Sequence, residues 1–172
     1  MRTLHLLRHA KSSWKDAALD DHDRPLSKRG RRAARALADH LARSHVAPDL
    51  VLCSSALRAR ETLDLIAGAL KPPKVMVERE FYEAGPRRLL RSLRELPESA
   101  QCVLLVGHNP ALHELALALA DTPSARRLPA RDEKFPTAAL ASFRLAGAWS
   151  VLVPRSATLL AYVTPADIEG GG

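Results

Sequence analysis

Short apolar runs alternate along the chain with longer segments in which apolar residues recur every three or four positions. The short runs predict buried strands, and the longer segments have the spacing of helices that cover a sheet. The runs that predict strands lie at residues 3–7, 49–53, 74–77, 102–106, 139–145 and 158–163. Strands that alternate with helices indicate an α/β fold.

The first helix is expected to begin after Ser27, which acts as its N-cap. One face then carries a stripe for burial against the sheet, formed by Gly30, Ala34, Leu37 and Leu41. Gly30 permits close approach of another segment. Further helices are predicted at residues 56–70 and 86–96 and after Pro110, and Pro86 stands at a helix start, where its missing N–H costs nothing.

The length of 172 residues fits one compact unit, which we assign to residues 1–168. Residues 120–136 are polar and hold three prolines, so we expect a loop or flap there. Residues 169–172 contain three glycines and are expected to be a frayed tail.

Composition excludes some classes of protein. Aromatic residues are only 4% of the chain, which disfavours the base-stacking surfaces of proteins that bind single-stranded nucleic acids. No apolar run approaches the roughly 20 residues of a membrane span. Cys53 and Cys102 match no paired metal spacing, so we interpret them as reduced core thiols of a cytoplasmic protein. The formal charge of +7 suits an anionic partner.

Candidate chemistry follows the ends of the first four predicted strands. Arg8 and His9 follow the first strand, the segment 54–58 follows the second, 81–83 the third, and His108 the fourth. Ligands of open α/β sheets bind outside the carboxyl ends of the strands, so we expect these residues to converge. Two arginines, two histidines and a carboxylate would then share one small volume.

This set of side chains is suited to a phosphoryl group. Guanidinium groups offer forked donors that match phosphate oxygens. One histidine could attack phosphorus through a neutral ring nitrogen, while the other donates to the transferring oxygens. Each residue also has a simpler structural explanation: Arg8 and His9 as an exposed loop pair, His108 as part of a strand-to-helix turn, and Glu83 as a partner of a helix dipole.

Ordered motifs cover nearly the whole chain. They are Arg8-His9-Ala10-Lys11-Ser12-Ser13-Trp14, Arg24-Pro25-Leu26 before Arg29-Gly30, Ser54-Ser55-Ala56-Leu57-Arg58-Ala59 before Thr62, Val106-Gly107-His108-Asn109-Pro110, Lys134-Phe135-Pro136-Thr137, and residues 162–165. In these motifs the sequence resembles the histidine phosphatase superfamily, in its SixA-like phosphohistidine phosphatase branch. The family implies a phosphoglycerate-mutase-like fold: a three-layer sandwich with a mostly parallel central sheet and helices on both faces.

The resemblance also implies roles for individual residues. His9 would be the nucleophile that becomes phosphorylated, Arg8 and Arg58 would clamp the phosphate, and His108 would be the second histidine of the pocket. Glu83 corresponds to the residue that protonates the leaving group in the wider superfamily. Ser12 and Lys15 are the expected substrate-binding residues at the mouth. The reaction needs no metal and no cofactor.

The expected substrate is phosphohistidine on a signalling protein, and a small phosphorylated metabolite is the alternative. Ala10 and Lys15 stand where mutase branches carry Gly and Asn, and the chain is short for a mutase of this superfamily. A binding module for phosphate or nucleic acid is a further alternative, since basic residues crowd the segment 24–35. We interpret that segment as the solvated side of a helix and expect no nucleic-acid or membrane partner. The sequence makes no prediction of oligomeric state.

Two other catalytic classes fit poorly. A cysteine-dependent phosphatase needs five residues between its thiolate and its arginine, but only four separate Cys53 from Arg58. Metal binding by His108, His113 and Glu114 lacks the His-Glu-x-x-His spacing of a helical zinc site. Both alternatives are therefore disfavoured.

Overall fold

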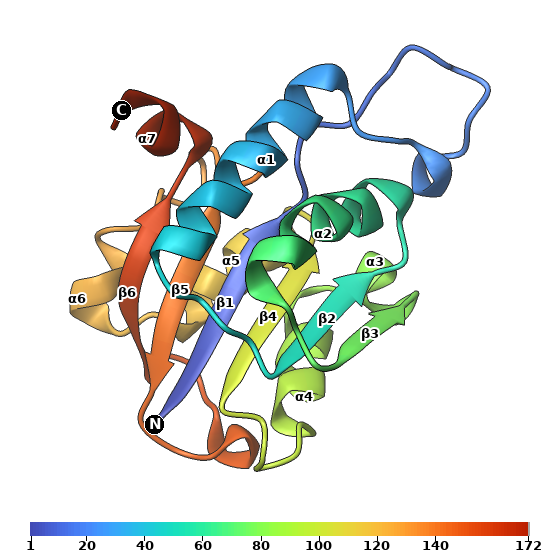
Figure 1. The fold of residues 1–172 in the computed structure, drawn as a ribbon. Coiled ribbons are helices and arrows are strands. Elements are labelled where there is room, and N and C mark those ends of the chain that lie inside the picture. Colours follow the sequence, from blue (N-terminus) through green and yellow to red (C-terminus); the bar gives the residue numbers. More distant parts are fainter. Residues whose placement is uncertain (172) are drawn as a thin grey trace.

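The computed structural model describes residues 1–171, which form a single six-stranded sheet flanked by helices (Figure 1). The strands are β1 (Arg2–Arg8), β2 (Leu50–Ser54), β3 (Val75–Glu78), β4 (Cys102–Gly107), β5 (Leu140–Leu145) and β6 (Ala157–Val163). The α-helices are α1 (Lys28–Arg43), α2 (Leu57–Leu70), α3 (Glu80–Glu83), α4 (Pro86–Arg94), α5 (Ala111–Leu119), α6 (Thr122–Ala125) and α7 (Pro165–Gly170). Short 3₁₀ turns are η1 (Asp21–Asp23) and η2 (Trp149–Val151).

The strand order in the sheet is β3-β2-β4-β1-β5-β6. The pairs β2–β3, β2–β4 and β1–β4 are parallel, whereas β5 runs antiparallel to both of its neighbours. Helices α1 and α2 cover one face of the sheet, and α3, α4 and α5 lie on the other (Figure 1). The predicted three-layer α/β fold with a mostly parallel sheet is confirmed.

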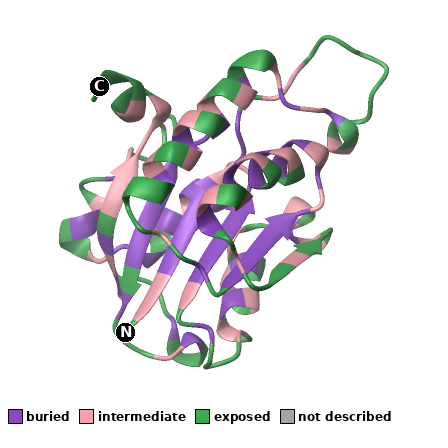
Figure 2. Ribbon diagram, viewed as in Figure 1, coloured by how far each residue is buried: buried purple, intermediate pink, exposed green. Residues whose placement is uncertain are grey.

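Side chains of each central strand alternate between two apolar cores, one on each face of the sheet. The central strands are buried along most of their length (Figure 2). In β1, Leu4 and Leu6 join the core beneath α4 and α5, while Leu7 joins the core beneath α1 and α2. This burial holds the carboxyl end of β1, and with it Arg8 and His9, rigidly in the sheet. No helix within residues 1–171 has the length and apolar character needed to cross a membrane.

Helix α1 begins as the sequence predicts. The Ser27 hydroxyl accepts a hydrogen bond from the Gly30 N–H at 3.0 Å, which satisfies a free donor of the first turn. The buried stripe consists of the expected residues Gly30, Ala34, Leu37 and Leu41. A Cβ at position 30 would lie 2.1 Å from the carbonyl oxygen of Lys11. Only glycine therefore lets α1 pack on the segment that follows His9.

Two expectations about irregular segments need correction. The predicted loop 120–136 contains α6, and its end is anchored in the core by Phe135, which is fully buried. The predicted frayed tail is wrong for Glu169 and Gly170, which lie in α7. A capping box between Thr164 and Asp167 stabilises that helix and outweighs the effect of the glycines. Gly172, also assigned to the tail, is outside the described residues.

Candidate active site

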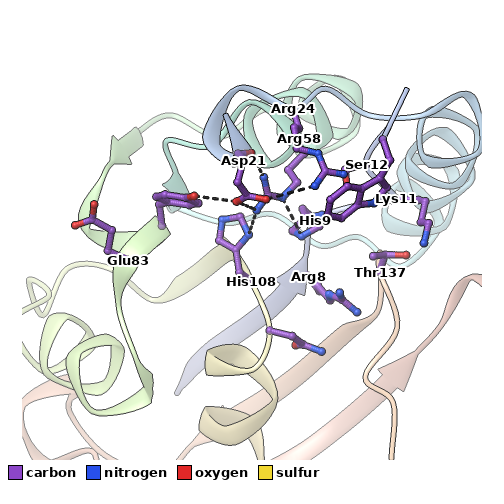
Figure 3. A pocket seen from close by; sticks show the side chains of 13 residues that line it. Arg8, His9, Lys11, Ser12, Asp21, Arg24, Arg58, Glu83, His108 and Thr137 are labelled. Atoms are coloured by element: carbon purple, nitrogen blue, oxygen red, sulfur yellow. Dashed lines mark hydrogen bonds and ion pairs between the residues drawn. The ribbon is translucent and has the colours of Figure 1, made fainter. Parts of the chain in front are cut away.

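The carboxyl ends of β1, β2 and β4 meet around a pocket of about 590 Å³, named here the catalytic pocket. Arg8 and His9 come from the end of β1, Arg58 from the first turn of α2, and His108 from the residue after β4 (Figure 3). The side chains that the strand ends predict to converge thus lie together. Parallel strands produce this convergence because their carboxyl ends share one edge of the sheet.

His9 is buried, and its ring is fixed by its own neighbour. Nδ1 lies 2.7 Å from the carbonyl oxygen of Ala10, so Nδ1 carries the proton and donates it. Nε2 is left with a free electron pair, toward which the Nε–H of Arg58 points at 3.3 Å. Burial lowers the pKa of His9 to about 3, and the charge of Arg58 acts in the same direction. His9 is therefore a neutral imidazole with Nε2 available as a nucleophile.

Arg58 is held by the loop that precedes α1. Its Nη1 donates to the carbonyl oxygen of Asp21 at 2.6 Å, and its Nη2 donates to Asp21 Oδ2 at 2.9 Å. These contacts offset the unfavourable position of a cation in the first turn of a helix. Thr62 ties the same turn to β1, because its hydroxyl donates to the Arg58 carbonyl and accepts from the Ala10 N–H.

Arg8 lies in the wall of the pocket opposite the loop that contains Asp21. Its Nη1 donates to the Phe135 carbonyl at 2.8 Å, and Asn109 Nδ2 donates to the same oxygen at 2.9 Å. Burial and the neighbouring charge of Arg58 lower the pKa of Arg8. The end of the segment 120–136 therefore positions two donors of the pocket.

His108 faces His9, with ring centroids 4.9 Å apart. Its Nε2 lies 2.6 Å from Ser54 Oγ, and that oxygen also accepts from the Ala56 N–H. Arg58 Nη2 can only donate, so His108 Nδ1, which lies 3.4 Å from it, is the acceptor, and the His108 proton is on Nε2, which donates to Ser54 Oγ. Burial lowers the pKa of His108 to about 4, and the charge of Arg58 acts in the same direction, so the ring is neutral.

Asp21 and Tyr82 are pocket residues to which the sequence analysis assigned no role. The Tyr82 hydroxyl donates to Asp21 Oδ2 at 2.8 Å, and the carboxylate also pairs with Arg58 and, at 3.5 Å, with Arg24. Desolvation acts to raise the pKa of Asp21, but these hydrogen bonds and charges outweigh it and lower the pKa. A sequence signal for Asp21 was available: acidic residues at 20, 21 and 23 in a chain whose mouth is otherwise basic.

The remaining predicted site residues lie at the rim. Glu83 lines the pocket, but its carboxylate pairs with exposed Arg79 at 2.9 Å and is directed away from His9 and His108 (Figure 3). Ser12 lines the pocket. Lys15 is exposed and is absent from the lining, where Lys11 provides the cation instead.

The geometry does not favour a cysteine nucleophile or a metal centre among the described residues. Cys53 is fully buried, and burial raises the pKa of its thiol to about 12. A thiol of this kind is a core residue and not a nucleophile. Within residues 1–171, no three His, Cys, Asp or Glu side chains are grouped to hold a metal ion. The cationic side chains that line the pocket, and that can hold an anion, are Arg8, Lys11, Arg24 and Arg58.

Comparison with known proteins agrees with this geometry. Residues 4–86 match the histidine phosphatase superfamily (branch 1). An uncharacterized protein of Mycobacterium tuberculosis, Rv1276c, is 37% identical over 164 residues that cover 92% of this chain and 99% of the relative. A protein from Nakamurella multipartitia assigned as the phosphohistidine phosphatase SixA is 32% identical, with a TM-score of 0.79 over 95% of this chain and 96% of the other.

The protein histidine phosphatase SixA complexed with tungstate is 25% identical, with a TM-score of 0.79 over 96% of this chain and 99% of the other. The chain belongs to the histidine phosphatase superfamily and has a phosphoglycerate-mutase-like fold. It is SixA-like in sequence and structure, as the sequence motifs predict. Membership and these neighbours support phosphatase activity.

Proposed function

We propose that this protein is a metal-independent phosphatase that removes the phosphoryl group from phosphohistidine on a protein, by way of a phosphorylated His9. The observation that carries the proposal is the state of His9. Its Nδ1 proton is engaged by the Ala10 carbonyl, and its pKa is lowered to about 3, so Nε2 is an unprotonated nucleophile at neutral pH.

In the first step, the Nε2 electron pair of His9 attacks phosphorus, and a bond between phosphorus and Nε2 forms. The bond to the leaving nitrogen breaks, and that nitrogen takes up a proton from solvent. Arg8 and Arg58 would donate to the phosphoryl oxygens, where charge accumulates in the transition state. In the second step, water attacks phosphorus, inorganic phosphate leaves, and His9 returns to its neutral form.

The leaving group favours phosphohistidine over a phosphate ester. A phosphoramidate leaves readily once its nitrogen is protonated, so its cleavage depends little on a dedicated acid. The candidate acid, Glu83, is exposed and paired with Arg79, and Asp21 has a lowered pKa that keeps it ionised. The similarity to SixA proteins supports the same substrate class. A phosphorylated metabolite is the second candidate, because the arginines would bind its phosphate equally well.

Hydrolysis of a phosphohistidine peptide and of an aryl phosphate, both with excess chelator, tests the proposal. We expect the wild type to cleave the peptide faster and His9→Ala to cleave neither. Circular dichroism verifies folding, and His45→Ala, at an exposed histidine, is the matched control. Full activity in His9→Ala would refute the role of His9 as the nucleophile. Activity that requires added metal would refute the metal-independent reaction.

A second variant tests Glu83. If Glu83 assists departure of the leaving group from the rim of the pocket, Glu83→Gln lowers turnover of the aryl ester by more than that of the phosphohistidine peptide. The control is Glu78→Gln, an exposed carboxylate at the end of β3 that does not line the pocket. Equal losses on both substrates would contradict the argument from the leaving group.

A further inference from the structure

A second hollow, of about 640 Å³, lies beside the catalytic pocket. Arg8, Lys11 and Thr137 line both, so the two hollows are adjacent. The outer walls of the second hollow come from α1, from residues 134 and 136, and from the start of α7. We name it the basic hollow, and its charged residues are Arg8, Lys11, Arg29, Arg32, Lys134 and Glu169.

Among the described residues, most cations of the basic hollow form no ion pair. Within residues 1–171, no ion pair involves Lys11, Arg29, Arg32 or Lys134. Arg29 and Arg32 are three residues apart on α1, where like charges repel, and both lie near the positive end of the helix dipole. In contrast, Arg31 of the same helix pairs with Glu61 at 2.6 Å. Five cations of the basic hollow thus share one carboxylate, that of Glu169, whereas Arg31 of the same helix has its own partner.

Arg8 links the two hollows and has an unused donor. Its Nη1 binds the Phe135 carbonyl, but its Nε is buried and has no hydrogen-bond partner. A buried donor without a partner is costly, and a nearby anion would satisfy it. Because Arg8 lines both hollows, this unpartnered donor points to an anion where they meet.

We propose that the basic hollow is a subsite for a second anionic group of the substrate whose phosphoryl group lies against His9. This inference rests on the proposed function for the place of that phosphoryl group. Arg29 and Arg32 provide forked donors that match a carboxylate or a phosphate, and Lys11 stands between the two anions. The second anion is either an acidic side chain of the phosphorylated protein or a second phosphate of a small metabolite, since both present the same chemistry.

Phosphonates test the subsite without turnover because their bond between carbon and phosphorus is not hydrolysed. Calorimetry would compare alkyl monophosphonates with alkylene bisphosphonates whose spacers have two to six carbons. At the matching length we expect the bisphosphonate to bind about tenfold more tightly, well above the factor of about two that two equivalent ends give statistically. The double variant Arg29→Ala/Arg32→Ala should remove this advantage. Arg35→Ala, at an exposed position of α1 outside both hollows, should retain it.

The outcomes separate this inference from the proposed function. A wild type that binds monophosphonate but shows no advantage at any spacer length overturns the subsite alone, as does an advantage that survives the double variant. A wild type that binds neither ligand overturns both. A wild type that shows the advantage but hydrolyses no phosphohistidine supports the subsite and contradicts the proposed function.

A second experiment identifies the source of the second anionic group. Two phosphohistidine peptides that differ only in Glu or Gln beside the phosphorylated residue would be compared as substrates. A lower KM for the acidic peptide, lost in Arg29→Ala/Arg32→Ala, assigns the second anion to a protein side chain. Equal KM values together with the bisphosphonate advantage assign it to the second phosphate of a metabolite.

Discussion

The carboxylate of Asp21 holds the guanidinium of Arg58, with Oδ2 2.9 Å from Nη2, and the backbone carbonyl of Asp21 lies 2.6 Å from Nη1. The Arg58 Nε–H points toward Nε2 of His9. Asp21 thus orients the Arg58 guanidinium toward the expected position of the phosphoryl group. Its negative charge also opposes an incoming phosphate, so one residue acts on binding and on turnover in opposite directions.

Asp21→Asn should separate these two effects. Loss of the charge frees Arg58, and we expect kcat to fall about tenfold because the clamp is less well oriented. KM should stay the same or decrease, because repulsion of the anionic substrate is removed. Steady-state kinetics on an aryl phosphate gives both values, with Asp20→Asn, an exposed neighbour, as the control. An unchanged kcat would show that Asp21 does not position Arg58.

Ser54 should determine which ring nitrogen of His108 carries the proton. In Ser54→Ala, Nε2 of His108 loses its partner, so we expect a mixture of tautomers. We also expect kcat to fall about tenfold, an effect of the size found for residues that orient metal-binding histidines. Nitrogen NMR of the ring distinguishes the tautomers directly. Ser55→Ala is the control, since Ser55 Oγ contacts His22. A wild-type His108 with its proton on Nδ1 would contradict the assignment.

Gly30→Ala should damage both stability and activity. The added Cβ would overlap the Lys11 carbonyl, so α1 or the segment after His9 must shift, at a cost of about 1 to 3 kcal/mol. Urea unfolding and turnover of an aryl phosphate measure the two effects. Gly68→Ala in α2 is the matched control, because nothing lies within 4 Å of its added Cβ. That variant should be neutral or stabilised by about 0.5 to 1 kcal/mol. Equal behaviour of the two variants would contradict the packing argument.

The place of Gly30 could be predicted from the sequence, whereas the contact of Asp21 with Arg58 could not. Gly30 belongs to a periodic pattern, and the residues at strand ends follow from the apolar runs, so these positions are predictable from local order. Asp21 lies in a stretch without periodicity, and its contact with Arg58 depends on the path of the whole segment between β1 and α1. No local pattern encodes that path.

Rim residues were predicted less well for a similar reason. Glu83 reaches the pocket wall, but its carboxylate pairs with Arg79, a contact between residues four apart on the surface that the motif does not reveal. Lys15 was expected at the mouth, but the chain bends at residue 15 and leaves this side chain exposed outside the lining, which contains Lys11. The capping box that extends α7 is readable in Thr164 and Asp167, but the glycines that follow obscured it.

His5 should make the stability depend on pH. Its burial in β1 lowers its pKa from 6.5 to about 4, so between these values the unfolded chain binds a proton that the folded protein does not. Stability therefore falls as pH falls from 6.5 toward 4, by on the order of 1 kcal/mol or more at pH 5 from this residue. Urea unfolding of His5→Asn at pH 7 and pH 5 should show a smaller decrease than the wild type. His45→Asn, at an exposed position, is the control. An unchanged pH dependence in His5→Asn would contradict the assignment.

The most direct test of the central claim is to trap the phosphorylated enzyme. Substrate labelled at phosphorus would be mixed with enzyme and quenched in alkali within milliseconds, and the labelled peptide would be identified by mass spectrometry. The account predicts an acid-labile, alkali-stable phosphate on His9, absent in His9→Ala and present in His45→Ala. Label on another residue of the wild type would contradict it, and so would His9→Ala protein that turns over substrate at the wild-type rate.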